Sequence, residues 1–197
     1  MRTGFTRKWD LSEAAAIAIV LLGLMLLGPG PARSQDSERA KAQALVDAAI
    51  KMTQGDQAVK LLWQATEIDP TLNDAYLYLG LYYNSREDFG KVVEVYKKLV
   101  KYQPKGDAAT SAYLNIGEAY LSFKPPQYDD ALPYYRKAYE LDPNSALAAL
   151  RIGEIMAKQG NRSEAARYLK QASSGTSKDS AVAAEAQRLL AELGGPL

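Results

Sequence analysis

The chain has 197 residues, of which 47% are hydrophobic and 24% are charged, and its formal net charge is +1. This composition is typical of a folded globular protein, and the balanced charge excludes the strongly basic surface of a nucleic-acid-binding domain. The sequence has no cysteine and no histidine. Their absence excludes disulfides, thiolate nucleophiles, Ser-His-Asp catalysis and the commonest ligands of transition metals.

Residues 1–34 differ in composition from everything that follows. A basic start precedes an apolar run at 14–27, and a Gly-Pro-Gly-Pro sequence then breaks any helix. This is the layout of a secretory signal peptide with a cut before Gln35. The apolar run is shorter than the roughly 20 residues of a membrane span, but a retained N-terminal membrane anchor and a buried core helix stay open as alternatives.

Either the signal peptide or the anchor would place the remainder of the chain outside the cytoplasm. We therefore expect an exported protein of the periplasm or cell envelope. It would be soluble after cleavage or anchored by its N-terminal segment, and membrane contact would come only through residues 14–27 if they are uncleaved.

Behind this segment, hydrophobic periodicity and turn residues predict helices along the whole chain. Prolines 70, 104 and 143 mark the ends of three of them, because the residue before a proline avoids the α conformation. In chain order, we expect helices near residues 37–53, 56–68, 73–85, 88–102, 107–123, 127–141, 145–158, 161–173 and 178–193.

The predicted helices carry a repeated pattern of side chains. Five features recur in the same order: an aromatic residue, an apolar residue followed by glycine, a second aromatic residue, a third aromatic residue in the next helix, and a closing proline. The second copy has Tyr76, Leu79, Gly80, Tyr83, Tyr96 and Pro104; the third has Tyr113, Ile116, Gly117, Tyr120, Tyr135 and Pro143. This pattern resembles the tetratricopeptide repeat, a helical hairpin of roughly 34 residues.

The resemblance implies an all-α fold, a right-handed α-solenoid of about four helical hairpins plus a C-terminal capping helix. The first helix of the first repeat is degenerate, and the third repeat carries two extra residues around 124–126. Within a domain of residues 36–193, the repeats are expected at about 39–72, 73–106, 110–145 and 146–177, and the cap at 178–193.

No motif for chemistry accompanies the repeats. The sequence contains no phosphate-binding Gly-rich loop and no Ser-x-x-Lys signature. The acid pair Asp129 and Asp130 is interpreted as helix-start charge that complements the helix dipole. We therefore predict that the protein is not an enzyme and that it has no cofactor, no metal site and no nucleic-acid partner.

The resemblance also implies that the first helices of successive repeats line a concave groove for a protein or peptide. By repeat register, the partner-binding residues are Leu77, Leu81, Asn84, Leu114, Glu118, Leu121, Leu147, Leu150 and Glu154. Such a leucine floor with acidic edges favours an apolar or amphipathic segment with some basic residues. The carboxylate clamp of the family, which needs Lys, Arg and Asn, is not expected here.

Two alternatives to groove binding stay open. The groove leucines could pack under a neighbouring repeat or under the chain's own N-terminal helix. The hairpins could also associate with copies of themselves or with a membrane complex. The sequence thus favours an exported adaptor that binds a protein or peptide, with a structural subunit of a larger assembly as the alternative.

Overall fold

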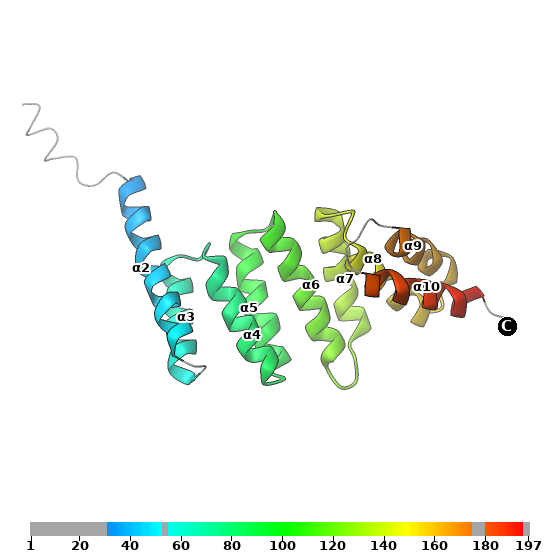
Figure 1. Ribbon diagram of the computed structural model, residues 1–197, viewed down its shortest axis with the longest axis horizontal. Helices are drawn as coiled ribbons and strands as arrows, with labels where there is room; N and C mark the ends of the chain where they lie inside the picture. Colours follow the sequence, from blue (N-terminus) through cyan, green and yellow to red (C-terminus); the bar gives the residue numbers. More distant parts are fainter. Residues whose placement is uncertain (1–30, 53–54, 175–179, 195–197) are drawn as a thin grey trace, which may run out of the picture. The chain divides into compact units, whose positions relative to one another are not determined.

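The computed structural model describes residues 31–52, 55–174 and 180–194, and all regular elements within them are α-helices (Figure 1). Residues 1–30 lie outside this description, and the predicted cut before Gln35 falls within the first described helix. The helices are α2 (Pro31–Lys51), α3 (Asp56–Ile68), α4 (Asn73–Ser85), α5 (Phe89–Tyr102), α6 (Asp107–Ser122), α7 (Tyr128–Leu141), α8 (Ala146–Lys158), α9 (Arg162–Ser174) and α10 (Ser180–Gly194).

The chain divides into two compact units, Met1–Ala40 and Lys41–Leu197. The described part of the first unit is the beginning of α2, and the second unit holds the remaining helices. No described helix combines the length and apolar character needed to cross a membrane. The apolar run at 14–27 lies outside the described residues.

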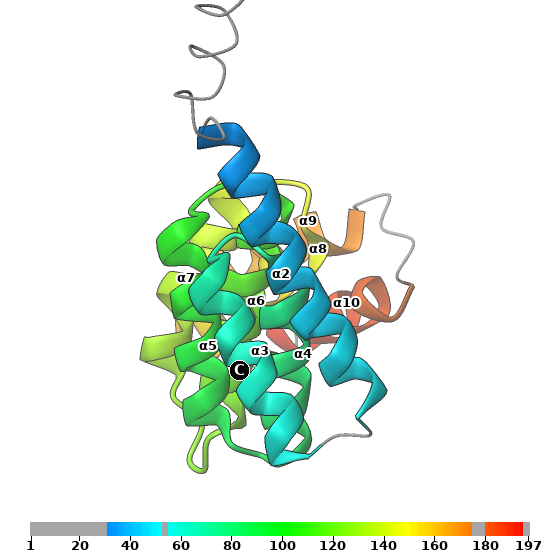
Figure 2. The ribbon, with the colours of Figure 1, turned by 90° about the vertical axis from the view of Figure 1, so that its left-hand side faces the viewer.

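Within Lys41–Leu197, consecutive helices pack as a row of hairpins. α4 packs against α5, α6 against α7 and α8 against α9, and each hairpin also contacts the next one along the chain. Viewed along the row, α5 and α7 lie on one side and α4 on the other (Figure 2). α10 packs against α8 and α9 as the predicted cap would. The expected all-α solenoid is therefore confirmed.

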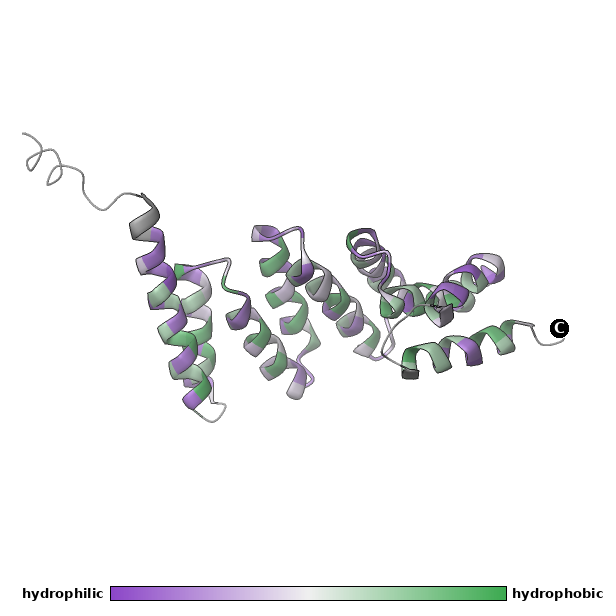
Figure 3. Ribbon diagram, turned by 45° about the horizontal axis from the view of Figure 1, so that its top comes forward, coloured by the Kyte–Doolittle hydropathy of each residue, from purple (hydrophilic) through white to green (hydrophobic). Residues whose placement is uncertain are grey.

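The helix boundaries agree with the predicted ones to within two residues, except that α2 begins at Pro31 rather than near residue 37. Hydrophobic and hydrophilic residues alternate around the helices (Figure 3), as amphipathic helices require. Asp88 caps α5, since its carboxylate accepts a hydrogen bond from the backbone N–H of Lys91. Gly55 is the N-terminal capping residue of α3, and the Asp56 carboxylate accepts a hydrogen bond from the hydroxyl of Tyr82.

Glycine in the first helix of a repeat lets an aromatic ring of the second helix lie against its backbone. A Cβ atom on Gly80 would be 2.3 Å from the hydroxyl oxygen of Tyr96, and one on Gly117 would be 2.6 Å from Cζ of Tyr135. Both distances are too short for a real contact, so the rings occupy the space that a side chain would need. This explains why the repeat pattern pairs these glycines with these tyrosines.

Burial of these tyrosines predicts alkaline unfolding. Burial raises the pKa of Tyr76 to about 12, and it also raises the pKa of Tyr96 and of Tyr135. An unfolded tyrosine ionises near pH ~10, so above that pH the unfolded chain loses protons that the folded chain keeps. The contribution of these tyrosines to stability should therefore be fully present below pH ~10 and should fall steadily up to pH ~12.

Melting temperatures measured across this pH range would check the prediction. Tyr76→Phe should make the decline shallower, because one group that titrates differently in the two states is removed. A melting temperature that stays level up to pH ~12 would contradict it.

Candidate functional site

The predicted groove residues differ widely in exposure. On α4, Leu77 and Leu81 are 48% and 52% exposed, and Asn84 is exposed as well. Leu150 on α8 is buried in a core cluster with Leu169, so the alternative of packing under a neighbouring element applies to it. The remaining members are half-buried: Leu114, Glu118, Leu121, Leu147 and Glu154. The leucine floor is thus open along α4 and not continuous along the whole row.

An apolar pocket of about 450 Å³ opens beside Leu81. Its rim includes Ile50, at the end of α2, and Tyr78, both of them exposed large hydrophobic residues. Neither residue is among the partner-binding residues predicted from the sequence, and Ile50 was missed because the first repeat is degenerate. The full lining is Ala49, Ile50, Ala58, Val59, Leu62, Tyr78, Leu81 and Tyr82.

A second pocket, of about 290 Å³, lies on the α6 side of the same helix. Leu77 and Leu99 contribute apolar surface to it, while Asp74 and Asp107 contribute carboxylates. Within the described part of the chain, neither carboxylate makes a hydrogen bond or an ion pair. Helix α4 is therefore flanked by an apolar pocket on one side and a mixed apolar and acidic pocket on the other.

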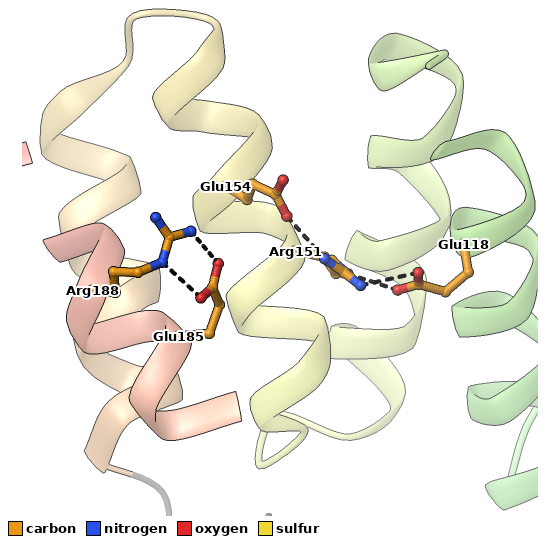
Figure 4. A network of polar contacts seen from close by, with 5 residues as sticks. All are labelled: Glu118, Arg151, Glu154, Glu185 and Arg188. Carbon is orange, nitrogen blue, oxygen red and sulfur yellow. Dashed lines mark hydrogen bonds and ion pairs between the residues drawn. The ribbon is translucent and has the colours of Figure 1, made fainter. Parts of the chain in front are cut away.

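Arg151 changes the predicted acidic edge of the groove. Its guanidinium donates two hydrogen bonds to Glu118, with Nε 2.7 Å from Oε1 and Nη2 3.1 Å from Oε2, and a third from Nη1 to Glu154 over 3.0 Å (Figure 4). Partial burial alone would lower the pKa of Arg151, but the hydrogen bonds to Glu118 and Glu154 and the charge of Glu118 outweigh it and raise this pKa.

These bonds tie α6 to α8 and offset the charge of both glutamates. Sequence reasoning placed Glu118 and Glu154 in the predicted concave groove but overlooked the cation between them. The expectation of acidic edges along the whole groove is therefore wrong for its C-terminal half. Beside α4, the carboxylates of Asp74 and Asp107 make no such ion pair within the described residues.

Metal ligands do not gather anywhere in the described part of the chain, where no group of three or more acidic side chains comes together. Asp129 and Asp130 lie in the first turn of α7, which agrees with their interpretation as helix-start charges. One of them, Asp129, accepts a hydrogen bond from Gln159 at 2.8 Å.

Residues 127–193, which cover α7 to α10, match the family model described as tetratricopeptide repeat. The close packing of a tyrosine against a glycine extends the same hairpin geometry back to α4 and α6. The chain therefore carries tetratricopeptide repeats (TPRs). This confirms the family assignment made from the spacing of the aromatic, glycine and proline residues.

The TPR chain is similar to larger proteins and to solved structures. It is 27% identical to mouse protein O-mannosyl-transferase TMTC1 over 138 residues, which are 70% of this chain but only 14% of that protein. YrrB, a TPR protein with an unusual peptide-binding site, has a TM-score of 0.58 at 19% identity and 80% coverage of each chain. Yeast Tom70 has a TM-score of 0.64 at 15% identity, with 78% of this chain and 32% of Tom70 covered. The two structural likenesses show the fold of the chain.

Proposed function

We propose that this TPR protein is an exported adaptor that binds a peptide segment of a partner protein in the two pockets flanking α4. One observation carries the proposal. Of the six large hydrophobic residues that are exposed in the described part of the chain, four lie at these pockets: Ile50, Leu77, Tyr78 and Leu81. Apolar residues gathered on one exposed surface mark a site of interaction.

Burial of this surface by a partner supplies the driving force. Leu81 leaves about half of its surface in water, and the rim of the apolar pocket offers Ile50 and Tyr78 beside it. Fully burying one large aliphatic side chain contributes about 1.5–3 kcal/mol. A partner side chain inserted between these residues would bury its own apolar surface and complete the burial of theirs.

Export is the second part of the proposal and rests on residues 1–34. Their basic start, apolar run and Gly-Pro break are the parts of a signal peptide. With this segment cleaved the adaptor would be soluble in the periplasm or cell envelope, and with it retained the adaptor would be anchored there. The absence of cysteine suits a chain that folds in an oxidising compartment without disulfides.

Leu81→Glu should weaken peptide binding by about ten- to a hundredfold, since it replaces apolar contact area worth roughly 1.4–2.7 kcal/mol with a charge. The probes are peptides selected from a random-sequence phage library against the wild-type chain. Their affinities for wild type and variant would be measured by isothermal titration calorimetry. The melting temperature should change little, because position 81 is half exposed.

Tyr102→Glu is the matched control, because Tyr102 is 47% exposed, lies on α5 and lines neither pocket. It should leave the affinity unchanged. Equal binding by wild type and Leu81→Glu would remove the α4 surface from the proposal. Light scattering, which measures the oligomeric state, distinguishes the adaptor from the alternative of a structural subunit. If the wild type is a dimer and Leu81→Glu is a monomer, this surface binds a second copy of the chain.

A further inference from the structure

We infer that the bound segment carries one large apolar residue and one lysine or arginine, held about 10 Å apart along α4. The inference rests on the proposed function and adds the chemistry of the partner. The two pockets beside α4 differ in lining, and each suits a different side chain.

The pocket beside Leu81 suits an uncharged apolar group. Its walls come from aliphatic residues of α2 and α3 and from the tyrosines of α4. None of its lining residues is acidic, and the Asp56 carboxylate, which accepts a hydrogen bond from the hydroxyl of Tyr82 at 3.1 Å, is already partnered. A charged side chain placed there would lose its hydration and find no free partner. A leucine, methionine or phenylalanine side chain would gain from burial instead.

The pocket beside Leu77 suits a long cationic side chain. Lysine and arginine carry an apolar stem and a charged head, and this pocket offers matching surfaces for both. Leu77 and Leu99 would contact the stem, and the free carboxylates of Asp74 and Asp107 would receive the head. An acidic side chain would face two like charges at the same place.

The part of the predicted groove formed by α6 and α8 does not offer an equivalent cation site among its described residues. Glu118 and Glu154 are the acidic residues there that register predicted for binding, and both already bind Arg151. A cationic partner residue would have to displace a guanidinium that makes three hydrogen bonds. A cationic residue of the partner should therefore bind the free carboxylates beside Leu77. This contact would fix where the bound segment lies along the row of hairpins.

The spacing of the two side chains follows from the rise of α4. Asp74 and Leu81 are seven residues apart, and at about 1.5 Å per residue this places them roughly 10 Å apart along the helix axis. An extended segment advances about 3.3 Å per residue. The apolar and cationic residues should thus be about three positions apart in an extended segment, or about seven in a helical one.

Selection of a random-sequence peptide library on the full-length chain tests this inference. We expect enriched peptides to pair a large apolar residue with a lysine or arginine at one of these spacings. The double variant Asp74→Asn/Asp107→Asn should bind them at least tenfold more weakly. It should also abolish most of the weakening that added NaCl causes in the wild type, because the screened attraction is gone.

The double variant Asp130→Asn/Glu140→Gln is the control, since it removes two exposed carboxylates from α7 and should leave the affinity unchanged. The inference would be overturned if the enriched peptides lacked a cationic residue. It would also be overturned if the wild type and the Asp74→Asn/Asp107→Asn variant bound them equally well. In either case, the effect of Leu81→Glu on peptide binding would still test the proposed function separately. Failure of the wild type to enrich any peptide would overturn the proposed function and this inference together.

Discussion

Gly117→Ala should destabilise the protein by about 2 kcal/mol, although alanine is the better helix former by roughly 1 kcal/mol. The added Cβ would lie 2.6 Å from Cζ and 2.8 Å from Cε1 and Cε2 of Tyr135. This ring is fully buried, so it cannot swing aside into solvent, and α6 and α7 would have to separate. Close-packed interiors resist such insertions at a cost of about 1–3 kcal/mol, sometimes more.

Gly90→Ala is the matched control, because Gly90 is a helical, exposed position on α5 where an added Cβ would meet only the Asp88 carboxylate, at 3.7 Å. It should be neutral or stabilising by up to about 1 kcal/mol. Thermal or urea unfolding would measure both variants, and the loss expected for Gly117→Ala corresponds to about 4–8 °C. Equal behaviour of the two variants would refute the packing of Tyr135 against Gly117.

Arg151→Met should cost about 2 kcal/mol, because it leaves two carboxylates facing each other without their cation. Breaking a fully buried ion pair costs about 3–5 kcal/mol. The side chains of Arg151, Glu118 and Glu154 retain 29%, 37% and 25% of their exposure, so water screens part of the effect. Methionine keeps most of the apolar stem, which isolates the loss of charge and hydrogen bonds.

The triple variant Arg151→Met/Glu118→Gln/Glu154→Gln should recover at least half of that loss, since no unpaired charge remains. Arg188→Met on α10 is the control: Arg188 also pairs with two glutamates, Glu185 and Glu192, but all three side chains are largely exposed. It should change stability little. Denaturant unfolding of the four proteins would decide, and a triple variant no more stable than Arg151→Met would contradict the role of the unpaired charges.

The repeat pattern predicted most of the fold because its signals are local. The limits of α3 and α4 agree with the predicted ones to the residue, since Pro70 follows closely on the end of α3 and the Leu-Gly pair at 79–80 sets the register of α4. The same register placed Leu77 and Leu81 on the exposed surface correctly. These features depend on residues a few positions apart, which a single sequence displays directly.

The site was predicted less completely because its remaining features join distant residues. Leu150 is buried because it shares a core cluster with Leu169 and with Ala186 of the cap. The repeat register shows which face of α8 a residue lies on, but it does not show that another helix packs over that face. The bond between Arg151 and Glu118 joins residues 33 positions apart. The apolar pocket needs Ile50, which lies in the repeat whose first helix departs from the pattern.

Site-specific photocrosslinking would show whether a bound peptide lies beside α4. A benzophenone-bearing residue would replace Leu81 in one protein and Tyr102 in another, and each would be irradiated with a peptide selected on the wild-type chain. We expect a crosslinked product from position 81 and none from position 102. A product from position 102 alone, or none from position 81 with a peptide that binds the wild type, would contradict it.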